Sequence, residues 1–380
     1  MSLTKTRAKS ARATTETVRF GGVDPVLLLT ALALTAFGIF AVYIAGDQSR
    51  NSYAVNQALG LLVGLAGAVP LTLLDYRLIL KYLRIIYGVM LAMLAAVLLL
   101  GASAGGAQRW IDLGPVQVQP SEFAKLFMVV VLAGYLARHP VGENKVFLAA
   151  LGIVAAPALL VFMQPDLGTA LVFGALFVVM SFIAGASLYQ LGTLGVAGVA
   201  GIILALKLKL LQEYQVARLT SFLHPNEPGA YNYQLAQSKL AIGSGGITGK
   251  GFGATTLANL GFLPEDHTDF IFANLSERIG FFGGAVLLVL FFILIWRIFH
   301  VATISRDRFG VLLAVGVGTI FLFHVFVNVG MVMGIMPVTG IPLPFISYGR
   351  SSLVVSVVSL GILQSVAIRS RTETSKYPKS

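Results

Sequence analysis

Five polar residues, Glu265 to Asp269, stand directly before the apolar segment Phe270-Ile271-Phe272. This order places the carboxylate of Asp269 at a membrane surface, at the point where a helix re-enters the bilayer. A carboxylate in such a setting has the chemistry of a general acid or base. It can equally act as an N-cap for the helix that follows. The residues alone leave both interpretations of Asp269 open.

A second candidate is the glycine-rich stretch from Ile242 to Gly251, which contains Lys250 and follows Lys239. Backbone N–H groups in a segment of this kind can surround phosphate oxygens, with a lysine supplying charge. The spacing is not that of a Walker motif, because the residue after Lys250 is neither Ser nor Thr. The alternative interpretation is a flexible loop.

A third group of polar residues lies between Gly105 and Lys125. Ser121 is expected to be the N-cap of a helix, and Glu122 and Lys125 then lie three residues apart on one face. The pair is either a local ion pair at a helix start or part of the wall of a polar cavity, since charges facing lipid are costly. Trp110 is either part of that wall or an interfacial anchor.

Two further segments interrupt the apolar pattern. Asp166, in Gln164-Pro165-Asp166, is expected to cap the next helix, and a cap can also face a cavity. Residues 337–349 contain three prolines and two glycines between two apolar runs. Irregular backbone at that depth is tolerated only where protein or water surrounds it, so this segment is predicted to line a cavity.

The composition identifies the elements that must position these residues. Of the 380 residues, 57% are hydrophobic and 11% are charged, whereas soluble domains carry about a quarter charged residues. Lipid must therefore surround most of the chain. Segments of roughly 20 apolar residues predict ten transmembrane helices. They are residues 26–45, 54–74, 82–101, 121–137, 145–163, 167–185, 188–206, 278–298, 309–333 and 350–368.

This pattern predicts an all-α, multi-pass membrane protein with one transmembrane domain over residues 21–371. The long loop 207–277 joins helices seven and eight, and residues 1–20 and 372–380 form polar tails, the first of them basic and disordered. Of the 27 Lys and Arg residues, 17 fall on the side of the N-terminus, eight on the other side and two within or at the ends of spans. This distribution predicts cytoplasmic termini and outer long loops.

Charge and residue types also exclude some classes of function. The net charge of +11 is explained by basic cytoplasmic loops facing anionic membrane lipids, so no nucleic-acid partner is expected. The absence of cysteine excludes disulfides and thiolate metal sites, and five histidines argue against a multi-histidine metal site.

Six segments, in order along the chain, resemble the SEDS family of shape, elongation, division and sporulation proteins. They are GAQRWIDLG, QPSEFAK, QPDLGTA, YQLAQSKLAIGSGG, LPEDHTDFIFA and GIPLPFISYG. The resemblance implies a bacterial plasma-membrane enzyme, a peptidoglycan glycosyltransferase that polymerises lipid II on the outer face, and it favours a role in cell elongation. The implied partners are a class B penicillin-binding protein, which is a transpeptidase, and other elongation-complex proteins.

By the same resemblance, Asp269 corresponds to the essential aspartate of the family and is the predicted catalytic base of an inverting transfer. The predicted substrate contacts are Arg109, Trp110, Glu122, Lys125, Asp166, Lys239, Lys250, His267, Thr268 and Ser347. Arg278 and Arg350 depart from the family pattern, which tends to have an acidic residue and a glycine at those positions.

The leaving diphosphate requires positive charge. One source of this charge is the set of protein cations Arg109, Lys125, Lys239 and Lys250. The alternative source is a divalent cation, Mg²⁺ or Mn²⁺, bound near Glu265 to Asp269. No cofactor is certain from the sequence. Two other functions fit part of the pattern: a lipid II flippase, which would use intramembrane charges and a broken helix, and a non-catalytic scaffold of the cell-wall synthesis complex.

Overall fold

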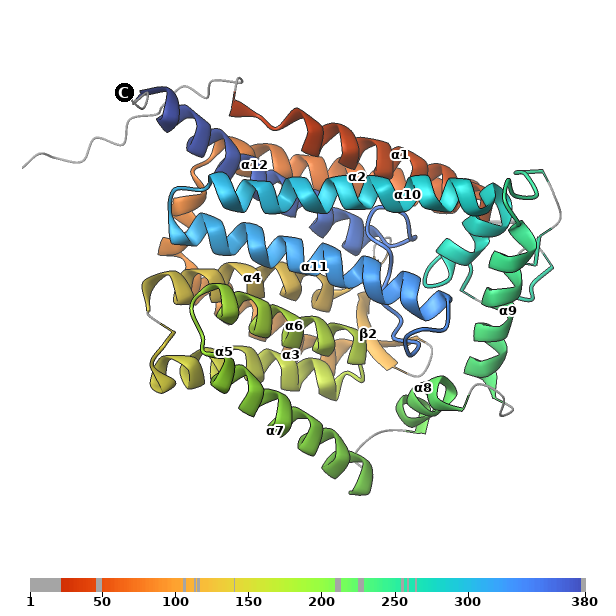
Figure 1. Ribbon diagram of the computed structural model, residues 1–380, viewed down its shortest axis with the longest axis horizontal. Coiled ribbons are helices and arrows are strands. Elements are labelled where there is room, and N and C mark those ends of the chain that lie inside the picture. Colours follow the sequence, from red (N-terminus) through yellow and green to blue (C-terminus); the bar gives the residue numbers. More distant parts are fainter. Residues whose placement is uncertain are drawn as a thin grey trace, which may run out of the picture.

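The protein is a bundle of long helices with a small group of loops and short elements at one end (Figure 1). This computed structural model describes residues 22–45, 50–104, 107–112, 114, 117–139, 141–208, 213–224, 229–253, 256–257, 260–263 and 265–376. The predicted tail 1–20 lies outside the described residues. The long helices are α1 (Pro25–Ala45), α2 (Arg50–Leu73), α3 (Leu83–Leu100), α4 (Pro120–Arg138), α5 (Asn144–Met163), α6 (Leu167–Ile183), α7 (Leu188–Lys207), α10 (Ile271–Ile304), α11 (Arg308–Val332) and α12 (Arg350–Lys376).

These helices confirm the predicted all-α, multi-pass architecture. In the described part of the chain, nine helices are long and apolar enough to span a membrane, and α6 is a shorter apolar helix of 17 residues. Each of the ten corresponds to one predicted span. Most of the bounds differ by only a few residues, because apolar runs of this length leave little freedom in where a helix lies.

The largest difference is at α10, which begins at Ile271 rather than near residue 278. Its first turns contain the buried, charged Glu277 and Arg278, which an apolar pattern cannot assign to a span. The helix is kinked at Gly280, whose φ is +66°. At the kink, the amide of Lys250 donates to the carbonyl of Glu277 (3.0 Å), so the glycine-rich segment packs against α10.

Three helices, α4, α11 and α12, are more buried than the other predicted spans. Most of their residues are buried, whereas α7 is exposed along nearly its whole length. Polar side chains on these helices, such as Lys125, His324 and Gln364, are buried. Polar side chains are unfavourable in contact with lipid, so these three helices occupy the centre of the bundle.

The two long loops contain their own short elements. Three short strands between α3 and α4 form a small antiparallel sheet in the order β1 (Ala102–Ala104), β2 (Ala107–Asp112) and β3 (Gln117–Val118). The predicted loop 207–277 contains α8 (Glu213–Leu223) and α9 (Ala230–Gly245), besides the first turns of α10. A short 3₁₀ helix, η2 (Tyr76–Lys81), joins α2 to α3.

The start of α1 and the end of α12 lie together at one end of the bundle. The amide of Asp24 donates to Gln364 Oε1 (2.9 Å), and Arg371 forms an ion pair with the Asp24 carboxylate (3.1 Å). In Figure 1 these segments are at the left, and β2, α8 and α9 are at the right. Helix α12 continues to Lys376, which is five residues into the predicted tail 372–380.

Candidate active site

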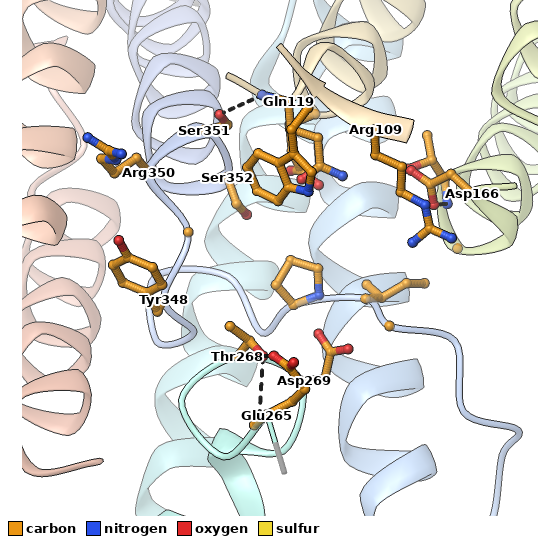
Figure 2. Close-up of a pocket in the computed structure, with 18 of the residues that line it drawn as sticks. Arg109, Gln119, Asp166, Glu265, Thr268, Asp269, Tyr348, Arg350, Ser351 and Ser352 are labelled. Carbon is orange, nitrogen blue, oxygen red and sulfur yellow. Dashed lines mark hydrogen bonds between the residues drawn. The ribbon is translucent and has the colours of Figure 1, made fainter. Parts of the chain in front are cut away.

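A polar cavity of about 480 Å³ lies at the end of the bundle that contains β2 and α8. Figure 2 shows Glu265, Thr268 and Asp269 on one wall, with Arg109 and Asp166 facing them. Eight of the predicted site residues line this cavity, from β2, α4, the start of α6 and the segment before α10. They are Arg109, Trp110, Glu122, Lys125, Asp166, His267, Thr268 and Asp269.

Asp269 is held at the cavity by its backbone, which leaves its carboxylate for other contacts. The N-cap position of α10 is Phe270, with no side-chain cap, so the alternative of Asp269 as an N-cap is wrong. The carbonyl of Asp269 accepts a hydrogen bond from Asn328 Nδ2 (3.0 Å). A β-carbon at Gly340 would lie 3.3 Å from the Asp269 carboxylate and 3.4 Å from the Arg218 guanidinium. Both groups therefore border the same glycine.

The cavity changes the acidity of Asp269. Burial raises the pKa of Asp269 from 3.8 to about 6, and the charge of Glu265 adds to the rise, while Arg218 and Arg109 act in the opposite direction. This is the direction expected where desolvation exceeds ion pairing. A hydrogen bond with Asp266 (3.2 Å) raises the pKa of the neighbouring His267. At neutral pH the Asp269 carboxylate is ionised, and it binds a proton more readily than an ordinary aspartate does.

On the facing wall, Asp166 has both roles that the sequence allowed. It caps α6, because its carboxylate accepts from the Thr169 amide (3.1 Å), and it also lines the cavity. The Ser121 hydroxyl donates to the same carboxylate (3.0 Å). The prediction of Ser121 as an N-cap is wrong, because α4 begins at Pro120 and the N-cap is Gln119. Arg109 donates to the carbonyls of Gln164 and Pro165 and so fixes this turn.

Glu122 and Lys125 form a buried ion pair of 2.7 Å and both line the cavity, so the two interpretations of the pair hold together. Lys125 Nζ also lies 3.1 Å from Nε2 of His324, on α11. His324 Nδ1 is 3.1 Å from the carbonyl of Pro342. The ion pair is therefore connected through one histidine to the irregular segment between α11 and α12.

That irregular segment, residues 337–349, lines the cavity as predicted and is fixed from three sides. Gly340, Pro342 and Tyr348 contribute to the lining. Asn328 Nδ2 donates to the carbonyl of Ile341 (2.8 Å). On the other side, Gln57 of α2 donates to the carbonyl of residue 347 (3.0 Å) and accepts from the amide of residue 349 (3.2 Å).

The relatives of this chain agree with this architecture. A family model described as "Cell cycle protein", covering FtsW, RodA and SpoVE, matches residues 25–372. The chain belongs to this family. It is 38% identical to the peptidoglycan glycosyltransferase MrdB of Escherichia coli K12, over 90% of this chain and 93% of that one. It is 36% identical to the stage V sporulation protein E of Bacillus subtilis, over 92% and 98%.

Solved structures with 28% identity to this chain have the same fold. One is a chain from a study of how a peptidoglycan synthase complex coordinates polymerization and crosslinking. It has a TM-score of 0.79 and 28% identity, and it covers 94% of this chain and 99% of that one. The Thermus thermophilus rod shape determining protein RodA has a TM-score of 0.69 and 28% identity, with 91% and 96% covered. The resemblance to the SEDS family is thereby confirmed.

Three residues that the family resemblance suggested as substrate contacts lie outside the cavity lining. The end of the Lys239 side chain lies against Gly334, in the turn after α11. Lys250 forms an ion pair of 2.6 Å with the buried Glu277. Ser347 Oγ donates to the carbonyl of Thr268 (2.7 Å) and accepts from the Leu343 amide (2.8 Å). A direct contact of these three with substrate stays a prediction.

The glycine-rich segment does not form the phosphate site that its composition suggested. Its amides are already engaged: Gly249 donates to the carbonyl of Gly245 (2.9 Å), Lys250 to that of Glu277, and Gly251 to that of Arg278 (2.9 Å). Backbone groups committed in this way are not available to phosphate oxygens. This segment stabilises the kink of α10 instead.

The two positions that depart from the family pattern have different surroundings. Arg278 is buried and donates to Asn274 Oδ1 (2.9 Å) and to the carbonyl of Phe252 (3.1 Å). Asn274 in turn donates to Asp266 (3.0 Å), so Arg278 supports the acidic segment from behind. Arg350 lines the cavity at the start of α12, where Figure 2 shows it beside Tyr348.

Three important side chains were not identified from the sequence. His324 and Asn328 lie within the predicted span 309–333, and polar residues inside a span are a recognisable signal of function. Arg218 lies in the long loop, where no pattern distinguishes it from the other basic residues. It lines the cavity, donates to the carbonyl of Thr339 (3.1 Å) and lies over the ring of Tyr231.

Proposed function

We propose that this chain polymerises lipid II into β-1,4-linked glycan strands in the polar cavity, with Asp269 as the general base. The chain is a peptidoglycan glycosyltransferase, as its family and its curated relatives indicate. The observation that supports Asp269 most strongly is its position in the cavity wall, with Arg109, Arg218 and Lys125 lining the same space. A base and cations around one cavity match the needs of a transfer from a lipid diphosphate.

The reaction that we propose balances with one base. The 4-hydroxyl of the acceptor sugar gives its proton to Asp269 as its oxygen bonds to the anomeric carbon of the donor. The bond from that carbon to the diphosphate breaks, and the lipid diphosphate leaves as an anion. One displacement converts an α-linked diphosphate into a β-linked sugar. A stable leaving anion requires no general acid, unlike an inverting glycoside hydrolase, which needs a base and an acid.

The acidity of Asp269 suits this role. A base works best when its pKa lies close to the working pH, because it is then ionised and still accepts a proton readily. A pKa of about 6 meets both conditions near neutral pH. An ordinary aspartate, with a pKa near 3.9, would be a weaker base. A base of this kind typically contributes about 10²–10⁴-fold to the rate.

We assign the stabilisation of the leaving diphosphate to Arg109, Lys125 and Arg218 rather than to a divalent cation. In the described part of the chain, no three His, Asp or Glu side chains are grouped so that they could hold a metal ion. The oxygens near Asp269 also have other partners: Asp266 contacts His267 and Asn274, and Glu265 accepts from Thr268 (2.9 Å). A chelator is expected to leave the rate unchanged, and a strong loss would assign this role to Mg²⁺ or Mn²⁺.

The cavity is proposed to open on the outer face of the bacterial plasma membrane, with both termini in the cytoplasm. Two observations support this orientation: the excess of basic residues on the terminal side, and the location of the cavity at the opposite end of the bundle. A class B penicillin-binding protein is the proposed partner. A structural relative comes from a complex that couples polymerization to crosslinking. The proposed role is in cell-wall elongation and cell shape.

The test is a lipid II polymerisation assay with the purified protein, with and without the partner. The wild-type protein should form glycan strands, and Asp269→Ala should form none while keeping a single cooperative melting transition and the same gel-filtration profile. If Asp269→Ala still forms glycan strands, Asp269 is not the general base. Transport of lipid II without any glycan formation by the wild-type protein would favour a flippase, and neither activity would favour a scaffold.

A further inference from the structure

His324 is a buried histidine in the middle of α11, and its two ring nitrogens contact different parts of the cavity wall. Its side chain is 2% exposed. Nε2 lies 3.1 Å from Lys125 Nζ on α4, and Nδ1 lies 3.1 Å from the carbonyl of Pro342. The position of the His324 ring is therefore set both by Lys125 on α4 and by Pro342 in the segment after α11.

The two contacts define the protonation of the ring. A carbonyl oxygen only accepts hydrogen bonds, so Nδ1 must carry the proton that is donated to Pro342. An ammonium group only donates, so Nε2 must accept from Lys125 and therefore carries no proton. His324 is thus neutral, with its proton on Nδ1, and it adds no charge beside Lys125.

The contact restricts Lys125 as well. Its ammonium has three N–H groups; among the described residues, one is directed to Glu122 Oε1 (2.7 Å) and one to His324 Nε2. Because two of the N–H groups of Lys125 are fixed by Glu122 and His324, the direction of the third N–H group is fixed as well. Lys125 lines the cavity. Glu122 alone would leave the end of a flexible side chain free to rotate.

We propose that His324 is a positioning residue, which holds the Lys125 ammonium so that its remaining N–H meets the diphosphate of the substrate. This inference rests on the proposed function of the cavity. A group aimed in advance at the place where negative charge develops stabilises the transition state without reorganising. His324 itself touches no reacting atom.

Two isosteric variants separate the two contacts of the ring. In His324→Gln, the amide oxygen takes the place of Nε2 and still accepts from Lys125, but the donor to Pro342 is lost. In His324→Asn, the amide nitrogen takes the place of Nδ1 and still donates to Pro342, but the acceptor for Lys125 is lost. We expect kcat to fall about tenfold in His324→Asn and to stay within about threefold of wild type in His324→Gln.

A double-mutant cycle distinguishes positioning from a general structural role. If His324 acts through Lys125, then His324→Asn should lower the rate no further in the Lys125→Met background. Thr319→Val is the matched control, because it removes a buried hydroxyl bond (2.8 Å to the Val315 carbonyl) on the same helix, outside the cavity lining. Its rate should equal that of wild type.

Binding of inorganic diphosphate, measured by thermal shift, gives a readout that does not depend on glycan synthesis. His324→Asn should weaken it about tenfold and His324→Gln should not. The inference is overturned if His324→Asn matches wild type in both the rate and the diphosphate-binding assay. It is also overturned if His324→Asn lowers the rate by the same factor in the Lys125→Met background as in the wild-type background. Should His324→Asn fail to fold, a tenfold loss in folded His324→Gln overturns it. A wild-type protein that binds diphosphate but forms no glycan would refute the proposed function instead.

Discussion

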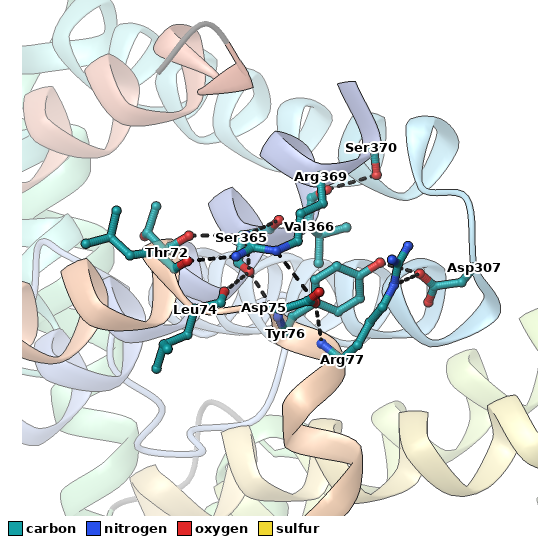
Figure 3. Close-up of polar contacts among 11 residues, drawn as sticks. Thr72, Leu74, Asp75, Tyr76, Arg77, Asp307, Ser365, Val366, Arg369 and Ser370 are labelled. Atoms are coloured by element: carbon teal, nitrogen blue, oxygen red, sulfur yellow. Dashed lines mark hydrogen bonds and ion pairs between the residues drawn. The ribbon is translucent and has the colours of Figure 1, made fainter. Parts of the chain in front are cut away.

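Charged residues gather at both ends of this bundle, and the two groups differ in how their charges are satisfied. One group, the terminal cluster, consists of Asp75, Tyr76, Arg77, Asp307 and Arg369, at the end that contains the start of α1 and the end of α12 (Figure 3). The other is the polar cavity (Figure 2). Both contain aspartate and arginine side chains at the ends of helices. The second surrounds a cavity of about 480 Å³ that a ligand can enter.

In the terminal cluster, each aspartate has direct partners. The Asp307 carboxylate accepts from the Tyr76 hydroxyl, from Arg77 (3.1 Å) and from the Gly310 amide (2.8 Å). Burial acts in the other direction, but these hydrogen bonds hold the pKa of Asp307 below its usual value. The ionised form therefore stabilises the fold. We interpret this cluster as structural, because it joins η2, α11 and α12.

In the polar cavity the balance is reversed. Desolvation raises the pKa of Asp269 to about 6, even though the charges of Arg218 and Arg109 act to lower it. Its ionised form therefore destabilises the fold relative to an exposed aspartate. A protein that keeps such a group has another use for it, and strongly shifted carboxylates in a cavity are candidates for catalysis. The direction of the pKa shift thus separates a structural aspartate from a chemical one.

The largest expected effect comes from removing one carboxylate charge at each end. Asp269→Asn should lower the rate of lipid II polymerisation by about 10²–10⁴-fold, because the amide cannot accept the proton. Asp307→Asn should leave the rate per folded molecule unchanged. Initial rates of the two purified variants, normalised to monodisperse protein, test this. Equal losses of rate in Asp269→Asn and Asp307→Asn would contradict the assignment of a catalytic role to the polar cavity and a structural role to the terminal cluster.

Arg218→Gln is expected to have a smaller effect of a different kind. The guanidinium lowers the pKa of Asp269 and lines the cavity beside the proposed diphosphate site. Without it, the rate should fall about tenfold, and the pH at which the rate is half-maximal should rise. The pH–rate profiles of the variant and wild type measure both quantities. If the pH of half-maximal rate is the same in Arg218→Gln and wild type, Arg218 does not influence the pKa of the catalytic base.

Gly340→Ala tests how tightly the cavity wall is built. The φ of Gly340 is +74°, and a β-carbon there would contact both the Asp269 carboxylate and Arg218. We expect a several-fold loss of activity and a cost of about 1 kcal/mol from the backbone conformation. Gly152→Ala in α5 is the control, because its β-carbon would meet nothing within 4 Å. Wild-type activity in Gly340→Ala would show that the wall adapts.

The last effects concern stability rather than rate, and they should have opposite signs. The pKa of Asp307 is lower in the folded protein than in the unfolded chain. Its charge therefore stabilises the fold at pH values above the unfolded pKa. This stabilisation is lost as the pH falls through the folded pKa. Asp307→Asn should therefore lower the melting temperature at pH 7.5. The pKa of Asp269 is raised, so its charge costs stability as pH rises from about 4 to about 6.

Asp269→Asn should accordingly raise the melting temperature at pH 7.5, and this gain should vanish below about pH 4. The change at the partly exposed Asp307 corresponds to about 1 kcal/mol, and the change at the buried Asp269 to at most about 3 kcal/mol. Thermal unfolding in detergent at both pH values measures them. A decrease in both variants at pH 7.5 would contradict the assignment of opposite shifts.

The sequence predicted the membrane helices well, because runs of apolar residues have few alternatives in a bilayer. The resemblance to the SEDS family identified eight of the residues that line the cavity, and the sequence itself drew attention to several of them because they lie at helix starts and in loops next to spans. Asp269 and Asp166 are examples. Polar residues at those positions must lie near the membrane boundary and near one another.

The sequence could not predict contacts between distant segments. Lys250 pairs with Glu277 rather than facing a ligand, because α10 begins earlier than its apolar run and buries that carboxylate. Arg218 borders Gly340 from α8, an 11-residue helix inside the predicted loop 207–277 that is too short to be predicted as a membrane span. His324 lies in a span that was correctly predicted, but its partners on α4 and in the segment after α11 depend on how the helices pack.

The most direct test of the central claim is the pH dependence of the initial rate of glycan synthesis by the wild-type protein at lipid II concentrations well below KM, where the rate reports the pKa of the free protein. If Asp269 is the base, the rate should rise about tenfold per pH unit below about pH 6 and level off above it. A rate that stays constant from pH 4.5 to pH 8, or that has its midpoint near pH 4 (rough limits set by the ordinary pKa of aspartate), would contradict the assignment of Asp269 as a base tuned by the cavity.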